Sequence, residues 1–280
     1  MIDATGCIVA PGFIDMHSHS DLTLPVLPTA DSMVHQGITT AVTGQCGLSA
    51  APLKPEYRQE MVTALQALFA VELPAERWTT FASYLDFLTE IGTSVNVAPL
   101  VAQGMVRASV MGFAAGPANA EQLARMQEEV IQAMDAGAIG VSTGLIYPPG
   151  SFASTEELIA VTRPAAERGG LYFSHIRGES GTLLEAIGEA IRIGAETGAG
   201  VHISHFKAAG REHWNKASAA LALVVLARAK GLDVTAVMYP YLAGSTFLKS
   251  MLPEWAQDGG DEATLRRLAD PQLRPRLVES

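Results

Sequence analysis

The feature that most constrains the fold is a regular alternation of short apolar runs with longer segments of helical periodicity. Seven runs have the length and composition of strands, and they cover residues 12–16, 39–43, 95–101, 139–142, 171–174, 201–204 and 234–238. In the segments between them, such as residues 123–134 and 183–191, apolar residues recur at helical spacing. This alternation predicts an α/β fold in which parallel strands are joined by helical crossovers.

Local signals mark where the predicted helices begin and end. Ser154 precedes Thr155, Glu156 and Glu157, which is typical of a helix cap with acidic residues in the first turn. Glycines at 137, 169 and 231 come just before the next strand, where a helix commonly ends. These boundaries support the strand and helix order read from periodicity.

The chain length at first suggests a complete (β/α)₈ barrel, since such barrels typically have about 250 residues and this chain has 280. However, only seven strand runs are found. After residue 238 the sequence predicts a loop, a helix near residues 262–269 and no eighth strand. We therefore expect residues 1–280 to form a single, incomplete TIM-like (β/α)₈ barrel domain. Its two unpaired sheet edges would favour self-association.

Composition excludes several classes of protein. The formal net charge is −10 and there is no cluster of basic residues, so neither nucleic acid nor an anionic membrane is an expected partner. An uncharged stretch, residues 136–155, contains too many glycines and prolines to span a membrane. The N-terminus lacks the features of a signal peptide, and two cysteines do not form a disulfide framework. We expect a cytoplasmic protein with reduced thiols.

Five residues able to bind a metal follow four of the predicted strands: His17, His19, Cys46, His175 and His205. In an extended segment, residues two apart share a face, so the two histidines of the first strand can point into one site. The carboxyl ends of barrel strands converge on one face of the domain. A set of imidazoles and a thiolate suits zinc or a similar metal.

Each of these residues also has a purely structural interpretation. An isolated His-X-His is commonly a coincidence, a lone buried cysteine commonly serves packing, and a single histidine after a strand commonly makes a structural hydrogen bond. Their repetition at equivalent strand ends favours a metal site. The remaining histidines are left outside it: His35 near a helix end, His213 in a polar segment, and His202, which faces away from His205 in a strand.

These segments resemble a known family. Residues 9–21, VAPGFIDMHSHSD, look like the first-strand signature of the amidohydrolase superfamily. More narrowly, the chain resembles the N-acyl-D-amino-acid deacylases, or D-aminoacylases. The segments that carry this resemblance are QGITTAVTGQCG (36–47), GLIYPPG (144–150), SHIRGE (174–179), ISHFK (203–207) and YPYLAGST (239–246). The cysteine motif separates this branch from relatives that use a carboxylated lysine.

The resemblance implies a zinc ion bound tightly by Cys46, His175 and His205. It also implies a second, weaker metal position at His17 and His19. Lys207, Tyr239 and Ser245 match the residues that hold the α-carboxylate of the substrate in this family, and an ammonium and two hydroxyls are suitable donors to a carboxylate. The implied activity is zinc-dependent hydrolysis of the linear amide bond of an N-acyl-D-amino acid, a small-molecule substrate. The products are a carboxylate and a free D-amino acid.

Two departures from the family suggest a fragment. The small β-sandwich that flanks the family's barrel is not found, and the aspartate that serves as general base after the eighth strand is expected beyond Ser280. No catalytic general base is therefore assigned within the chain. Two alternatives stay open: a dihydroorotase- or hydantoinase-like cyclic amidase, disfavoured by the cysteine and the carboxylate-binding set, and an inactive metal-binding fragment that needs a second chain.

Overall fold

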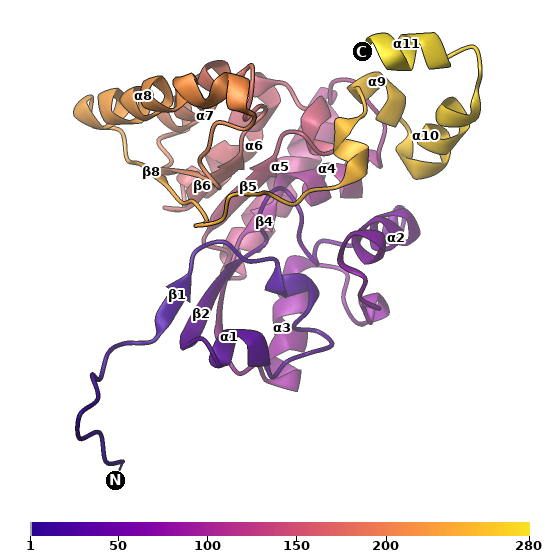
Figure 1. The fold of residues 1–280 in the computed structure, drawn as a ribbon. Coiled ribbons are helices and arrows are strands. Elements are labelled where there is room, and N and C mark those ends of the chain that lie inside the picture. The colour runs from indigo at the N-terminus through magenta and orange to yellow at the C-terminus, as the bar shows by residue number, and fades with distance from the viewer. Residues whose placement is uncertain (1) are drawn as a thin grey trace.

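The computed structural model describes residues 2–280, apart from the side chains of residues 67–69. Its strands are all parallel and form two sheets, with orders β1-β2-β3 and β4-β5-β6-β7-β8 (Figure 1). Their bounds are β1 Phe13–Asp15, β2 Ile38–Thr43, β3 Asn96–Pro99, β4 Val101–Ala102, β5 Gly140–Gly144, β6 Leu171–His175, β7 Val201–Ile203 and β8 Val234–Ala236. The expected parallel α/β fold is confirmed.

The eight strands correspond to the seven predicted runs, because the third run is divided into β3 and β4 at Leu100. The backbone N–H of Leu100 donates to the carbonyl of Thr43 at 2.9 Å, and that of Ile139 donates to the carbonyl of Pro99, also at 2.9 Å. The divided run therefore bonds to β2 on one side and to β5 on the other. It joins the two sheets into one curved wall, which is not closed between β8 and β1 within residues 2–280.

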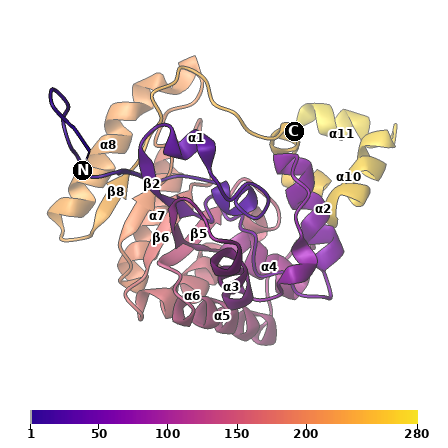
Figure 2. The same cartoon turned by 90° about the horizontal axis from the view of Figure 1, so that it is seen from below.

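Helices α1 to α8 lie between strands in the chain, whereas α9, α10 and α11 follow β8, and α10 and α11 lie to one side of the wall (Figure 2). The longer ones are α2 Arg58–Phe69, α3 Phe81–Ile91, α4 Gln103–Met111, α5 Ala120–Asp135, α6 Thr155–Ala166, α7 Leu183–Thr197, α8 Ala217–Ala229 and α10 Gly260–Ala269. Shorter ones are α1 Asp31–Val34, α9 Glu254–Gln257, α11 Arg274–Glu279 and the 3₁₀ turns η1 Ser20–Leu22, η2 Ala75–Arg77, η3 Gly150–Phe152, η4 Arg211–Lys216 and η5 Leu248–Met251. As predicted, the Ser154 hydroxyl accepts from the N–H of Glu157 and caps α6.

The cores lie between the sheet wall and the helices. One large cluster packs the first strands against α2, α3, α4 and α5, and a second packs the later strands against α6, α7 and α8. Within the larger cluster, Arg107 on α4 is fully buried and forms a 3.0 Å ion pair with Glu157 on α6. The apolar spacing read from the sequence thus corresponds to the helix faces that are buried.

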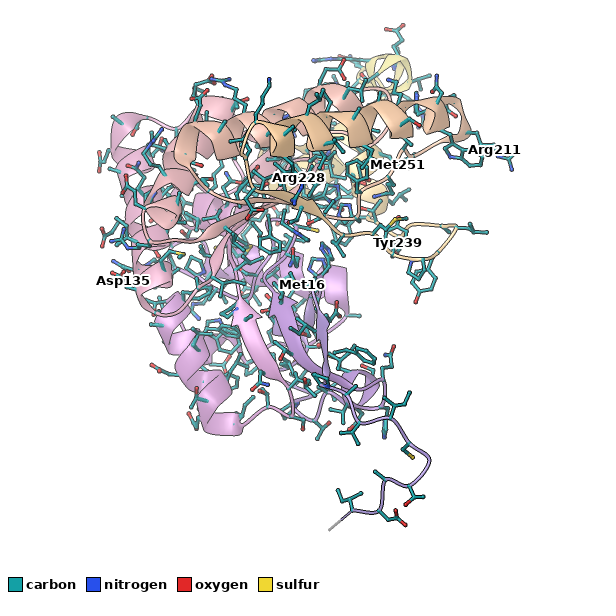
Figure 3. The ribbon with its side chains drawn as sticks, turned by 90° about the vertical axis from the view of Figure 1, so that its left-hand side faces the viewer. Met16, Asp135, Arg211, Arg228, Tyr239 and Met251 are labelled. Carbon is teal, nitrogen blue, oxygen red and sulfur yellow. The ribbon has the colours of Figure 1, made fainter. Side chains whose placement is uncertain are left out.

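The side of the molecule that carries β1 and β8 is different. Figure 3 looks at the structure from this side, with Met16 after β1 and Tyr239 after β8 labelled. Phe13 and Ile14 on β1 are 65% and 60% exposed, and Val225 on α8 is 56% exposed. Large apolar side chains therefore face solvent on the edge strand β1 and on α8, the helix packed against the other edge strand, β8.

None of the helices in the described part of the chain is both long and apolar enough to cross a membrane.

Candidate metal centre

The five ligand-type side chains predicted from the sequence lie together at the carboxyl ends of the strands. They form two groups that share the cysteine, namely His17, His19 and Cys46, and Cys46, His175 and His205. Within each group the ligand atoms all lie within 4.8 Å of one another. This spacing is close enough for one ion to contact every member of a group after small side-chain adjustments.

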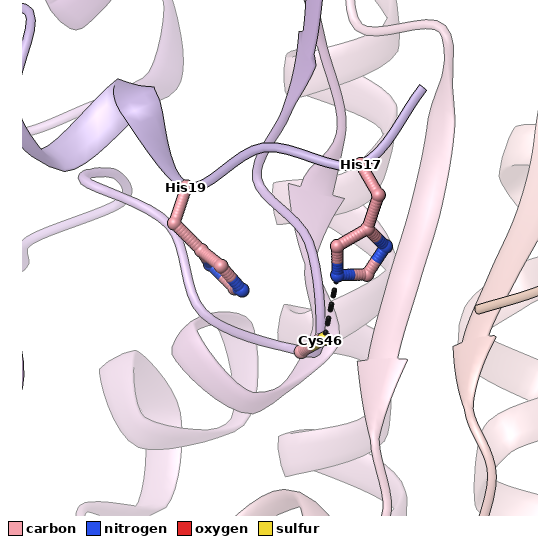
Figure 4. Close-up of side chains that lie close together, drawn as sticks. All are labelled: His17, His19 and Cys46. Carbon is pink, nitrogen blue, oxygen red and sulfur yellow. Dashed lines mark hydrogen bonds between the residues drawn. The ribbon is translucent and has the colours of Figure 1, made fainter. Parts of the chain in front are cut away.

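His17 and His19 reach the site in a way that the strand argument did not describe. β1 ends at Asp15, and the following residues bend, with His19 preceding the 3₁₀ turn η1. The two rings nevertheless lie edge to face with centroids 5.6 Å apart, and both point toward Cys46 (Figure 4). The Nε2 atom of His17 is 3.4 Å from the Cys46 sulfur. Their proximity was predicted correctly, but the reason, alternation along a strand, was wrong.

Cys46 is buried in a tight loop after β2. Its φ is +55°, which is unusual for a residue with a side chain. The loop can lie directly on the end of β5 because glycine occupies position 144, where a side-chain carbon would come within 1.9 Å of the Cys46 carbonyl oxygen. The backbone therefore fixes the position of the thiol.

His175 at the end of β6 and His205 just after β7 complete the second group. His175 is the last residue of β6 and is 5% exposed, and its ring lies 4.3 Å from that of His205, centroid to centroid. The Nε2 atom of His205 is 3.6 Å from the Cys46 sulfur. His205 also has a positive φ, +36°. Such backbone strain is concentrated at functional sites, and here it occurs at two of the candidate ligands.

Burial favours the neutral form of His17, His19 and His175. Burial, and then repulsion from the neighbouring histidines, lowers the pKa of His17 to about 3 and that of His19 to about 4. Burial and the nearby His205 likewise lower the pKa of His175 to about 3. Burial raises the pKa of the Cys46 thiol. Neutral imidazoles are the form that binds metals, whereas the thiol must lose its proton to do so.

The residues fit a bound cation. Neither ring nitrogen of His175 has a hydrogen-bond partner among the described residues, although both are buried. Buried polar atoms of native proteins are normally satisfied, so this pair calls for an explanation. A metal ion bound to the unprotonated ring nitrogen would account for that atom, and the combination of thiol and imidazole donors is one that zinc favours.

Sequence reasoning missed Glu179, which follows β6 by four residues. One of its carboxylate oxygens is 2.6 Å from Nδ1 of His205 and 2.6 Å from Nζ of Lys207. Burial by itself would raise the pKa of Glu179, but the close approach of His205, His175 and Lys207 holds it at about 2. The SHIRGE segment contained this residue, but its spacing from His175 gave no signal of a role.

Two of the three predicted carboxylate-binding residues, Lys207 and Tyr239, lie near each other. Lys207 follows β7, and its ammonium is 5.6 Å from the centroid of the Tyr239 ring. Ser245 is exposed and is preceded by Gly244, which packs against the Tyr239 hydroxyl. Among the described residues, no hydrogen bond joins Ser245 to Lys207 or Tyr239. The structure thus brings two of the three together and leaves Ser245 on the adjoining loop.

His202 lies apart from the cluster, as predicted. Its Nδ1 is 2.8 Å from the Thr235 hydroxyl on β8, and its ring packs on Phe173 with centroids 4.6 Å apart. These contacts are structural, between neighbouring strands.

A cavity of about 700 Å³ opens beside the cluster. It extends from Gly47, next to the cysteine, toward α2 and α10. The ring of Tyr147, one of its walls, lies 4.9 Å from that of His175, centroid to centroid. Apolar side chains dominate the described lining, including Leu48, Leu65, Met105, Phe113 and Leu252.

Taken together, the parallel β/α wall and the histidine and cysteine cluster at its strand ends define a barrel-type protein with a candidate metal centre on its carboxyl face. Residues 1–263 match the family model described as "Amidohydrolase family". The chain belongs to this family.

Individual relatives narrow the resemblance. The chain is 40% identical over 248 residues to the D-aminoacylase of Alcaligenes xylosoxydans xylosoxydans. The aligned region covers 89% of this chain and 50% of that protein. It matches the crystal structure of the N-acyl-D-glutamate deacylase of Bordetella bronchiseptica, complexed with zinc and a phosphonate mimic of the tetrahedral intermediate. There the TM-score is 0.79, the identity 38%, and the coverage 85% of this chain and 49% of that one.

A third match is a D-aminoacylase structure described in terms of its binuclear metal centre. Its TM-score is 0.77 and its identity 39%, with 85% of this chain and 49% of that chain covered. The chain spans about half the length of the curated relatives it matches.

Proposed function

We propose that this chain carries the metal-binding and carboxylate-binding parts of an N-acyl-D-amino-acid deacylase. The observation that carries this proposal is the contact of the buried Cys46 thiol with the imidazoles of His17 and His205. His175 lies beside them, and neither of its ring nitrogens has a hydrogen-bond partner among the described residues. Membership of the amidohydrolase family and the similarity to three curated deacylases support it. A metal-binding thiol also agrees with a reduced, cytoplasmic setting.

The proposed tight site consists of Cys46, His175 and His205, and zinc is the proposed metal. His17 and His19 form a second, weaker position that shares the same thiol. A bound zinc would polarise the amide carbonyl and lower the pKa of a water molecule. The protein contributes neutral imidazoles, a buried thiol and a backbone that holds them in place.

The substrate is oriented by its α-carboxylate. Lys207 supplies a positive charge, and the hydroxyls of Tyr239 and Ser245 supply hydrogen-bond donors, with Ser245 moving inward from its exposed position. A charge-assisted hydrogen bond to a carboxylate is about twice as strong as a neutral one. Fixing the carboxylate on this side places the scissile amide next to the cysteine and histidine cluster.

No general base is proposed from the described residues. Glu179 is engaged by His205 and Lys207, and a carboxylate oxygen of Asp15 accepts from the backbone N–H of His17. The aspartate expected beyond Ser280 stays a prediction.

The first test is zinc content. The wild-type chain is expected to retain zinc after dialysis against a weak chelator, whereas Cys46→Ala is expected to lose it. Cys7→Ala is the matched control, because Cys7 is the other free cysteine and is exposed. Equal metal content in all three proteins would refute the assignment of Cys46.

The second test is activity of the chain extended by the sequence that follows Ser280 in its gene. We expect release of D-methionine from N-acetyl-D-methionine and no turnover of N-acetyl-L-methionine or dihydroorotate. Hydrolysis of dihydroorotate would favour the cyclic amidase alternative. A zinc-loaded extended protein that releases no amino acid from any N-acyl-D-amino acid would overturn the proposal.

The lining of the cavity supports a preference for substrates with apolar side chains over those with acidic ones. Lys249 is the cation found in its described lining, and it is already paired with Asp261 at 2.5 Å. An acidic side chain would thus be desolvated there without a free partner, at a cost of several kcal/mol. We propose that the extended protein prefers apolar N-acyl-D-amino acids, measured as a higher kcat/KM for N-acetyl-D-phenylalanine than for N-acetyl-D-glutamate. Leu252→Lys should narrow the difference, and a preference for the glutamate substrate in the wild type would contradict it.

A further inference from the structure

Glu179 occupies a position that connects the two parts of the proposed site. It lies in the loop between β6 and α7, and its side chain is 15% exposed. Its backbone carbonyl accepts a 2.7 Å hydrogen bond from the N–H of Ala209, in the loop after β7. The loop that follows His175 is therefore tied to the loop that carries His205 and Lys207.

The carboxylate determines how His205 presents its ring. With Nδ1 held 2.6 Å from Glu179, the opposite nitrogen, Nε2, faces the Cys46 sulfur. The Lys207 ammonium lies 3.2 Å from the same Nδ1, and a proton on Nδ1 is favoured by the carboxylate, which is nearer. With the proton on Nδ1, Nε2 keeps its lone pair for a metal. This constraint matters because His205 lies just beyond β7 with a positive φ, outside the regular sheet ladder.

The same oxygen also holds the ammonium of Lys207, at 2.6 Å. A lysine side chain loses about 2 kcal/mol of conformational entropy when it is ordered. Holding Lys207 in place before the substrate arrives removes part of that cost from substrate binding. One carboxylate thus acts on a candidate metal ligand and on a candidate substrate-binding residue.

We propose that Glu179 is a positioning residue that sets His205 for metal binding and Lys207 for recognition of the substrate carboxylate. This inference rests on the proposed function, since it assumes that His205 is a metal ligand. Carboxylates that orient metal-bound histidines typically contribute 10–100-fold to metal affinity.

The experiment compares Glu179→Gln with Glu189→Gln by competition for zinc with a chromogenic chelator. Glu189 is a matched control: its side chain is 12% exposed, and it is paired with Arg177 at 3.0 Å. Glu179→Gln is expected to weaken zinc binding by about 10–100-fold, and Glu189→Gln is expected to leave it unchanged. Glu179→Gln must cause the same loss of zinc affinity when it is added to a Lys207→Met variant, because its effect on zinc acts through His205 and not through Lys207.

Urea unfolding of the metal-free variants measures their free energy of unfolding. It shows whether a loss of zinc affinity is accompanied by a loss of stability. If Glu179→Gln and Glu189→Gln lose zinc affinity equally, or if Glu179→Gln binds zinc as tightly as the wild type, the inference is wrong. Should the glutamine variant fail to fold, Glu179→Asp provides the comparison. Its shorter side chain keeps the charge, and unchanged zinc affinity in that variant would overturn the inference. Failure of the wild type itself to bind zinc through Cys46 would instead refute the proposed function.

Discussion

Gly144→Ala tests whether the backbone around Cys46 holds the metal centre. A methyl group at this position would lie 1.9 Å from the Cys46 carbonyl oxygen and 2.6 Å from its carbonyl carbon. Side-chain carbons do not approach backbone atoms closer than 3.0 Å, so the two segments must separate by about 1 Å. Both are backbone, and neither can move aside as a flexible side chain would.

The displacement is large compared with what a zinc site tolerates. Zinc–ligand distances vary by only about 0.2 Å around their standard values. We therefore expect Gly144→Ala to lower zinc affinity by at least about 100-fold, the upper end of the losses seen when a supporting residue is removed. The overpacking should also lower the free energy of unfolding by about 1–3 kcal/mol. Chelator competition measures the first effect, and urea unfolding of the metal-free protein measures the second.

Gly188→Ala is the matched control, because an added methyl at Gly188 on α7 would meet nothing within 4 Å. It should leave zinc affinity unchanged and stabilise the helix by about 0.5–1 kcal/mol. Wild-type zinc affinity in a folded Gly144→Ala protein would refute the reasoning, since it would mean that the position of the Cys46 thiol does not determine metal binding.

Three further outcomes are expected. Burial raises the pKa of the Cys46 thiol, so zinc binding should release its proton, and zinc affinity should increase about tenfold per pH unit between about pH 6 and 8. Calorimetry in buffers of different ionisation enthalpy measures the number of protons released. A value of zero would contradict the prediction. Glu157→Gln leaves the fully buried Arg107 without its charge partner. It should lower the free energy of unfolding, measured in urea, by about 3–5 kcal/mol. A decrease below about 1 kcal/mol, typical of an exposed pair, would contradict this. The double variant Ile14→Lys, Val225→Lys should reduce concentration-dependent association in sedimentation velocity. Ile14 is exposed on the edge strand β1, and Val225 is exposed on α8, which packs against the edge strand β8. Equal association of variant and wild type would argue against association through these surfaces.

The sequence predicted the order and direction of the strands because apolar periodicity reflects burial on two faces. It did not predict the break at Leu100, whose N–H bonds to β2 while the next residues bond to β5. A change of partner along one strand depends on the curvature of the whole sheet, and no local pattern in residues 95–101 records it. The predicted strand ends were wrong in both directions, since β1 stops at Asp15 before the bend that carries His17, whereas β5 continues to Gly144, beyond its predicted end at residue 142.

Candidate site residues were recognisable from sequence where the chemistry is carried by the residue type itself. Histidine and cysteine repeated after several strands are unusual, and the structure brings all five together. Glu179 was not recognisable, because a glutamate in a loop is ordinary and its importance comes from a contact with the following β/α unit. Gly144 was equally hidden, since its role is defined by the Cys46 carbonyl opposite it.

One consequence of the geometry is that the two candidate metal positions cannot be independent. Both groups of ligands include the Cys46 sulfur, with His17 at 3.4 Å on one side and His205 at 3.6 Å on the other. A thiolate shared by two cations donates less electron density to each, and the cations repel each other across a buried, weakly screened space. Filling the position at His17 and His19 should therefore weaken the metal bound by His175 and His205, and a titration should show two zinc affinities that are widely separated. Removing the first pair by His17→Ala and His19→Ala should eliminate only the weaker of the two.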